Sequence, residues 1–333
     1  GHTGYPHRIL TGRAAQFSTL NSFGGMSRFL ARSDSPHDIM DASHAGTALG
    51  TAIGLAQAMR MAGNRHRVIA VVGDGTLGEG SCWESLDSLA DTDLPVTLVV
   101  NNNGMAIAPT VGGISKPDAV EHLCCGLGLL YRLCDGHNLA QLLDMLDMMQ
   151  RDWAHCPGVL EVITEKGRGL PCAASHPYRM HFSMPFDPRT GTGASPTIAG
   201  RTYATVAAET LGSILAADPD VLVLTPGTPY ASGLEPLMAQ YAGRVIDVGM
   251  KEQHAVSMAA GLALGGTKPV ICMQSTFMQR AYDQILHDIC YMDLPVTFLC
   301  VRSGFAGYDS PTHHALWDIP VLSSFPRLRL HYA

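Results

Sequence analysis

Two stretches in the first third of the chain decide its fold: Arg67-Val-Ile-Ala-Val-Val-Gly-Asp-Gly75 and Val96-Thr-Leu-Val-Val-Asn-Asn-Asn103. Each is a short apolar run followed by glycine or polar residues, which is typical of a strand buried in a parallel sheet. Between them, from about Ser81, apolar residues recur at the spacing of one helix face. The order predicts a β-α-β unit, in which both strands are parallel and end at the same edge of the sheet.

The same alternation of strands and helices continues along the chain. We expect a helix at residues 139–153 and a strand at 158–164, and then a second series. That series has helices at 203–216, from about 252, and at 277–289, and strands at 221–224, 245–248, 269–273 and 296–301. Residues 187–202 are rich in Pro, Gly, Ser and Thr, as linkers are. The sequence therefore predicts an α/β chain of two successive domains with mainly parallel sheets.

Composition excludes several classes of protein. The chain has 333 residues, 46% of them hydrophobic and 15% charged, with a net charge of −7. It contains no apolar run of transmembrane length and no cluster of Lys and Arg, so we expect neither a membrane span nor nucleic acid as the main partner. The nine cysteines are scattered without a CxxC pair, which indicates reduced thiols in a cytoplasmic compartment. Because the chain opens without Met, we expect a fragment that lacks both ends. Targeting to a plastid is therefore left as an alternative to the cytoplasm.

The loop after the first strand has three interpretations. Gly73-Asp-Gly-Thr-Leu-Gly78 satisfies the dinucleotide-binding pattern, but the next strand ends in three asparagines where that pattern needs an acidic residue. Alternatively, Asp74 and Asn103 lie at the tips of adjacent strands and supply oxygen ligands to Mg²⁺, with the Met105 carbonyl beside them. A plain turn with strand-capping asparagines is the third possibility.

Glu252 follows a predicted strand and opens a helix, where a carboxylate is often favoured by the helix dipole alone. The combination of motifs is more specific than Glu252 alone. Gly73-Asp-Gly75, then Asn103, then Glu252-Gln-His254 after a linker resembles thiamine-diphosphate enzymes of the transketolase and 2-oxo-acid dehydrogenase group.

Within that group the chain most resembles the 1-deoxy-D-xylulose 5-phosphate synthase family. The resemblance covers nearly the whole chain and is carried by five blocks, at residues 1–13, 166–169, 251–256, 275–288 and 311–314. It implies a diphosphate-binding domain at 1–190, a linker at 191–202 and a partial pyrimidine-binding domain at 203–333. It also implies a homodimer with thiamine diphosphate and Mg²⁺, which joins pyruvate to glyceraldehyde 3-phosphate with loss of CO₂.

The resemblance also implies roles for individual residues. Glu252 would bond the cofactor's pyrimidine ring, Phe277 would stack on it, and Arg302 would hold the phosphate of the acceptor. The expected cofactor and metal residues are Gly73, Asp74, Gly75, Asn103, Met105 and Lys166, with Asp74, Asn103 and Met105 on the metal. Further active-site positions are His2, His44, His181, His313, Arg280 and Asp309. The active cleft is expected between the two domains.

Several residues depart from the family pattern. Gln274 stands in place of Tyr, Ala45-Gly46 in place of two serines, and Gly104 in place of Glu, and the stretch between Met105 and His181 is short. The departures leave a diverged ligase with another acceptor as an alternative. A nicotinamide oxidoreductase and a non-catalytic binding fragment are the alternatives from other classes.

Overall fold

The chain forms two units, each built on one parallel sheet. The computed structural model describes residues 3–176, 178–181, 183, 185–193, 201–305 and 311–332. One unit comprises His44–Thr197, and the other combines His2–Ser43 with Ile198–Ala333. The predicted α/β class with two mainly parallel sheets is confirmed. The proposed domain boundaries, 1–190, 191–202 and 203–333, stay a prediction.

The sheet of the first unit has the order β1-β2-β4-β3 and is parallel throughout. Its strands are β1 (Val68–Gly73), β2 (Val96–Asn102), β3 (Leu130–Asp135) and β4 (Gly158–Ile163). The apolar runs predicted three of them to within two residues. Strand β3 was not predicted. It is a largely exposed edge strand, and it mixes charged and apolar residues in the sequence Leu-Tyr-Arg-Leu-Cys-Asp.

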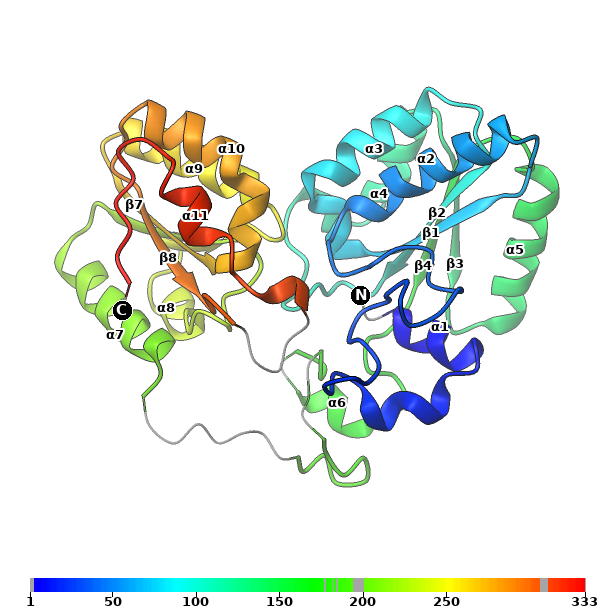
Figure 1. Cartoon of the computed structure of the whole chain (residues 1–333), viewed down its shortest axis with the longest axis horizontal. Coiled ribbons are helices and arrows are strands. Elements are labelled where there is room, and N and C mark those ends of the chain that lie inside the picture. The colour runs from blue at the N-terminus through cyan, green and yellow to red at the C-terminus, as the bar shows by residue number, and fades with distance from the viewer. Residues whose placement is uncertain are drawn as a thin grey trace. The chain divides into compact units, whose positions relative to one another are not determined.

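Helices cover both faces of this sheet (Figure 1). Alternate strand residues serve the two faces: Leu98 and Val100 join one core, whereas Val99 packs against the other. The first core is formed with α2 (Thr47–Met61), α3 (Gly80–Ala90) and α4 (Ala119–Gly126), and the second with α5 (Leu139–Asp152). The short α6 (Pro171–Ser175) follows β4 in sequence.

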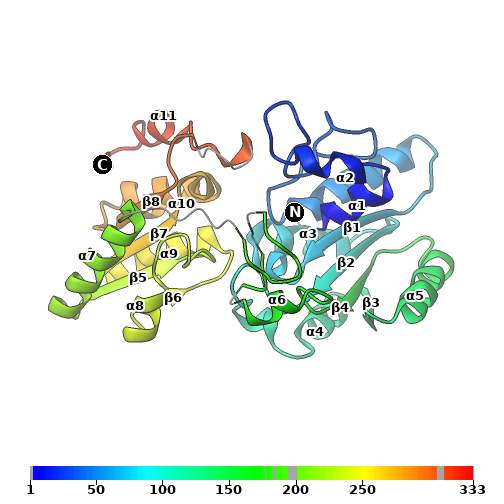
Figure 2. The ribbon, with the colours of Figure 1, turned by 90° about the horizontal axis from the view of Figure 1, so that it is seen from below.

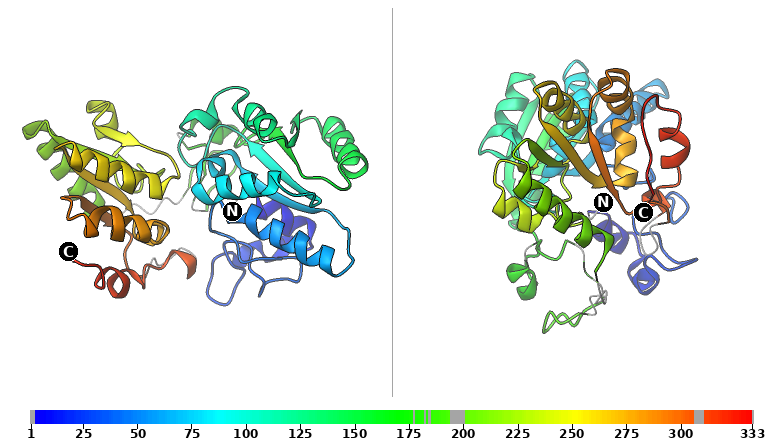
Figure 3. Two further views of the ribbon diagram at one scale, coloured as in Figure 1. Left: turned by 90° about the horizontal axis from the view of Figure 1, so that it is seen from above. Right: turned by 90° about the vertical axis from the view of Figure 1, so that its left-hand side faces the viewer.

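The second unit has the sheet order β6-β5-β7-β8, again parallel (Figure 2). The strands are β5 (Val221–Thr225), β6 (Val245–Asp247), β7 (Lys268–Gln274) and β8 (Thr297–Val301). One face packs against α7 (Tyr203–Ala217), which begins at the capping residue Thr202, and against α8 (Glu235–Gln240). The other face packs against α9 (Glu252–Leu264), residues 275–291 and α11 (Asp318–Leu322), as Figure 3 shows from two further sides.

The predicted helix at 277–289 is wrong in type. The chain instead forms a 3-10 helix at Ser275–Ala281, one turn of α-helix at α10 (Tyr282–Gln284) and a π-helix at Ile285–Tyr291. The physical reason is the spacing of the buried residues. Ser275, Met278 and Ala281 are all buried and are three residues apart, and this spacing lines up on one face of a helix with three residues per turn.

Residues 3–43 carry little regular structure beyond α1 (Gly4–Leu10) and a 3-10 helix at Ala14–Thr19. Their loops are organised by a buried ion pair. The Arg13 guanidinium donates to both carboxylate oxygens of Asp38, at 2.8 and 2.7 Å, and the backbone N–H of Ala31 donates to Asp38 at 3.2 Å. Ser43 then donates to the Thr312 hydroxyl at 2.7 Å, which joins this segment to the rest of the second unit.

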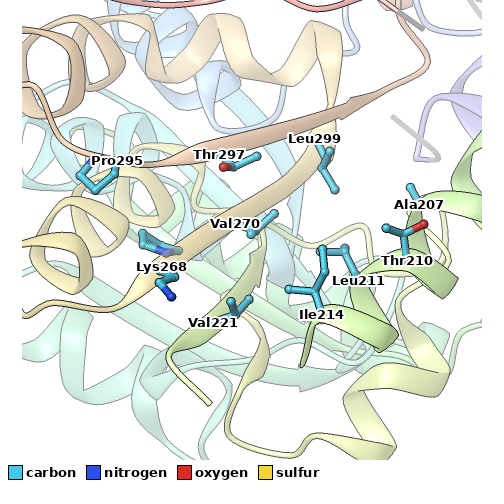
Figure 4. A pocket seen from close by; sticks show the side chains of 11 residues that line it. Ala207, Thr210, Leu211, Ile214, Val221, Lys268, Val270, Pro295, Thr297 and Leu299 are labelled. Atoms are coloured by element: carbon cyan, nitrogen blue, oxygen red, sulfur yellow. The ribbon is translucent and has the colours of Figure 1, made fainter. Parts of the chain in front are cut away.

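An apolar groove of about 370 Å³ lies between α7 and the neighbouring parts of β5, β7 and β8 (Figure 4). Leu211, Ile214, Val270 and Leu299 are among its lining residues. It is lined by no residue of the predicted site, so it is not the candidate active site. Among the described residues, no helix is long and apolar enough to cross a membrane.

Candidate cofactor and metal site

Asp74 and Asn103 are brought together by the pairing of β1 with β2. The register aligns Gly73 with Asn101, so the loops after both strands start at the same sheet edge. Asp74 is 6% exposed, and the backbone N–H of Asn103 lies 3.4 Å from its Oδ1. The Thr110 hydroxyl donates to Oδ2 of Asp74 at 2.5 Å.

The loop that follows β2 begins at Asn103, whose backbone N–H approaches this carboxylate. Oδ1 of Asn103 accepts a hydrogen bond from the backbone N–H of Met105 at 3.1 Å, across Gly104, whose φ of +70° is one that glycine adopts without strain. A carboxylate, an amide oxygen and a main-chain carbonyl are the hard donors that Mg²⁺ prefers. The residues present therefore fit the expected metal. The described part of the chain contains no cluster of three or more His, Cys, Asp or Glu side chains that could hold a different ion.

Lys166 lies in the loop after β4 and places a positive charge close to Asp74. Its Nζ donates to the Ala106 carbonyl at 2.7 Å and lies 2.7 Å from Nδ1 of His181. Burial lowers the pKa of Lys166 to about 8, and the negative charge of Asp74 opposes that shift. The structure thus brings together Lys166, His181 and Asp74, three residues that were predicted for the site. An anion bound there would stabilise the charged form of Lys166.

A buried carboxylate that was not predicted as part of the site lies beside Gly46, the residue before α2. Glu79 is fully buried and precedes α3. A Cβ added to Gly46 would lie 1.7 Å from Oε2 of Glu79, and Gly46 itself has a left-handed φ of +84°. The glycine at 46, one of the departures from the family pattern, therefore leaves the space that the Glu79 side chain fills. His44, two residues before Gly46, is exposed.

In the second unit, Glu252 is the first residue of α9 and is only 7% exposed. The loop that precedes it is shaped by Asp247, whose Oδ1 accepts hydrogen bonds from the backbone N–H groups of Gly227 and Gly249, each at 2.8 Å. A carboxylate on a solvated helix surface would have argued against a role in the site. Burial at the end of β6 is instead compatible with a functional carboxylate.

Three aromatic rings lie in contact next to the 3-10 helix that carries Phe277. The ring of His313 lies edge-on to Phe277, with centroids 5.6 Å apart. The ring of His313 also lies against Phe29, with centroids 5.5 Å apart and the rings nearly parallel. The Thr276 hydroxyl donates to the Thr312 carbonyl at 3.2 Å, which ties the 3-10 helix to the residue before His313. Phe29 was not predicted, since only the folded chain brings residue 29 near residue 313.

The remaining predicted residues are distributed as follows. Arg280 lies on the same 3-10 helix as Phe277, and Arg302 follows β8 with a left-handed φ of +58°. His2 and Asp309 lie outside the described residues. In both units, the predicted residues cluster after the carboxyl ends of parallel strands, which is where open α/β sheets bind their ligands.

Comparison with known proteins agrees with this arrangement. Residues 1–124 match the family model of 1-deoxy-D-xylulose-5-phosphate synthase, and residues 199–333 match that of the transketolase pyrimidine-binding domain. The chain is 36% identical to 1-deoxy-D-xylulose-5-phosphate synthase 2 of Geobacter sulfurreducens, over 98% of the chain and 59% of that protein. It is 39% identical to the synthase of Myxococcus xanthus, over 99% of the chain and 57% of that protein.

The chain therefore spans a little under three fifths of the length of these two relatives. The match with the Geobacter protein runs over 376 aligned positions, more than the 333 residues of the chain, so that relative contains residues with no counterpart here. The match with the Myxococcus protein runs over 335 positions.

The fold and the two residue sets define a transketolase-like chain, a class whose pyrimidine-binding domain implies thiamine diphosphate as cofactor. Within that class, the chain is similar to 1-deoxy-D-xylulose-5-phosphate synthases over nearly its whole length.

Proposed function

We propose that this chain provides the cofactor-binding part of an enzyme that decarboxylates pyruvate and transfers the two-carbon unit to D-glyceraldehyde 3-phosphate. The products are 1-deoxy-D-xylulose 5-phosphate and CO₂, which supply isoprenoid and thiamine precursors. The observation that carries the proposal is the placement of Asp74 beside Asn103 at the ends of adjacent strands. The names of the relatives support the reaction.

The roles of the residues in the first unit follow from their chemistry. Asp74, the Asn103 amide oxygen and the Met105 carbonyl would hold Mg²⁺, with Gly73 and Gly75 allowing close approach of a diphosphate. Lys166 would add a positive charge at the same place, since its ammonium group is already partly desolvated there. Desolvated charges attract an anion more strongly than solvated ones do.

The second unit would act on the reacting end of the cofactor. Thiamine diphosphate, when bound, supplies the electron sink that decarboxylation of a 2-oxo acid requires. Glu252 would hold a proton at the pyrimidine N1′ atom, and Phe277 would support the ring by stacking. His44, His181 and His313 would move protons on the substrates near neutral pH, because imidazole titrates in that range. We propose the same kind of role for His2, Arg280 and Asp309, and a homodimeric, cytoplasmic enzyme.

Arg302 would bind the acceptor's phosphate, since a guanidinium forms two charge-assisted hydrogen bonds with a phosphate group. The experiment compares D-glyceraldehyde 3-phosphate with D-glyceraldehyde as acceptors, using the full-length protein and pyruvate. The phosphorylated aldehyde should be strongly preferred, and Arg302→Ala should raise its KM by about tenfold or more while leaving the KM for pyruvate within about twofold.

A second candidate is a ligase of the same class with another acceptor. Gln274, which stands in place of the family's usual Tyr, is buried at the end of β7, close in sequence to Phe277. Equal use of the phosphorylated and unphosphorylated aldehydes would favour this candidate and would contradict the role given to Arg302.

A further inference from the structure

A carboxylate outside the described site is buried in the middle of the first sheet. Glu161 lies on β4, among residues that are otherwise Gly, Val, Leu and Ile, and is 6% exposed. Burying a charged group in such a setting is unfavourable unless hydrogen bonds compensate for the lost water. Both of its oxygens have such bonds: Oε1 accepts from the Asn102 side-chain amide at 2.5 Å, and Oε2 accepts from the Tyr131 hydroxyl at 2.6 Å.

The carboxylate fixes which way the Asn102 amide points. A carboxylate only accepts hydrogen bonds, so the NH₂ group of Asn102 must face Glu161 and its oxygen must face the other way. That oxygen accepts from the backbone N–H of Gly104 at 3.1 Å. Tyr131 is held as a donor, because burial and the neighbouring Glu161 raise the pKa of its hydroxyl.

This chain of hydrogen bonds ends in the loop that carries the proposed metal ligands. Gly104 lies between Asn103 and Met105, and its left-handed φ of +70° sets the bend that presents both. Resting on the proposed function, we infer that Glu161 and Tyr131 are positioning residues for Mg²⁺: they orient Asn102, which fixes Gly104 and thereby the two neighbouring ligands.

Outer groups of this kind change metal affinity by about 10–100-fold when removed. Glu161→Leu leaves the Asn102 amide free to rotate and should weaken Mg²⁺ binding, in the presence of thiamine diphosphate, by about tenfold or more. Glu161→Gln should retain most of the affinity. Its oxygen still accepts from Asn102, and its NH₂ group donates to the Tyr131 oxygen. Tyr131→Phe removes one of the two bonds and should give an intermediate loss.

The matched control is Thr164→Val. The Thr164 hydroxyl donates to the side chain of Asn101 at 2.6 Å, between the ends of the same two strands, but this bond does not reach Gly104. Mg²⁺ is titrated by calorimetry into the whole chain of each variant, and the unfolding midpoint of each is recorded. Thr164→Val should bind Mg²⁺ like the wild type.

Two outcomes would overturn this inference and leave the proposed function intact. One is wild-type Mg²⁺ affinity in both Glu161→Leu and Tyr131→Phe, and the other is an equal loss of Mg²⁺ affinity in Thr164→Val. If Glu161→Leu does not fold, Tyr131→Phe and Glu161→Gln decide the question by the ratio of their Mg²⁺ affinities to that of the wild type. A wild-type chain that binds thiamine diphosphate without any effect of Mg²⁺ would overturn the proposed metal site as well.

Discussion

At the scale of single residues, Lys166 is a cation in a place that disfavours its charge. Its pKa in the folded chain is about 8, below the ordinary 10.5, so the charged form is the one that burial penalises. Between these two pH values the unfolded chain binds more protons, and stability therefore rises with pH as Lys166 loses its proton. A bound diphosphate reverses this preference, because it interacts with the charged form.

We therefore predict that affinity for thiamine diphosphate falls as the pH rises from 7 to 9. Lys166→Met should bind about tenfold more weakly at pH 7, a loss of roughly 1.4 kcal/mol, and should show a smaller dependence on pH. Calorimetric titrations at pH 7, 8 and 9 check this. Identical pH slopes for the wild type and Lys166→Met would show that another group binds the diphosphate.

Gly46 is the second residue whose identity the structure explains. Its left-handed φ disfavours any other residue by about 1–2 kcal/mol, and a side chain would in addition displace the buried Glu79. Gly46→Ser should therefore lower the free energy of unfolding by about 2 kcal/mol or more. Adding Glu79→Ala should recover part of that loss, because it removes the clash but not the backbone strain.

Urea unfolding with Gly63→Ser as the control separates the two contributions. Gly63 has a φ of +74° with nothing within 4 Å of an added Cβ, so this variant has the backbone cost alone. If Gly46→Ser cost no more than Gly63→Ser, the coupling between positions 46 and 79 would be excluded.

At the scale of elements, the ends of the strands organise the candidate site. The apolar runs before Asp74 and Asn103 predicted that these residues end adjacent parallel strands, and the register of β1 with β2 has this arrangement. The edge strand β3 was missed, because it lacks such a run. The contacts of Lys166 with Ala106 and of Glu161 with Tyr131 were also missed, since they join residues 30 to 60 positions apart that no local pattern connects.

The segment that carries Phe29 depends on the buried pair of Arg13 and Asp38. Burial alone would raise the pKa of Asp38, but hydrogen bonds from Arg13 and from the Ala31 N–H outweigh it, and the net shift is downward. The pair therefore stabilises the fold above the ordinary carboxyl pKa, and this contribution is lost as the pH falls through the lowered value. Asp38→Ala should cost about 3–5 kcal/mol, because it leaves the guanidinium buried and unpaired.

Asp187→Ala is the matched control for this prediction. Asp187 pairs with Arg189 at 3.0 Å on the surface, where an ion pair contributes little because water screens the charges. Urea unfolding at pH 7 should show the large loss for Asp38→Ala only. Similar small losses in both variants would mean that the buried pair does not organise the segment.

At the scale of the whole molecule, the two units carry different parts of the proposed chemistry. Asp74, Asn103 and Lys166 belong to the unit of residues 44–197, whereas Glu252 and Phe277 belong to the other. In the sequence, the motifs of the two sets lie on either side of the stretch rich in Pro, Gly, Ser and Thr. Residues 2–43 group with the second unit through contacts that span almost the whole chain, such as Phe29 with His313, and no local sequence pattern connects such residues.

In the proposed enzyme, Asp74 holds a metal–diphosphate group while Glu252 serves the chemistry. The most direct measurement is calorimetric titration of thiamine diphosphate with and without Mg²⁺, into the wild type, Asp74→Ala and Glu252→Ala. The wild type should bind only with Mg²⁺, Asp74→Ala should lose this binding, and Glu252→Ala should keep it to within a few fold while losing about 10²–10⁴-fold in turnover. Binding that is unaffected by Mg²⁺ or by Asp74→Ala would contradict the account.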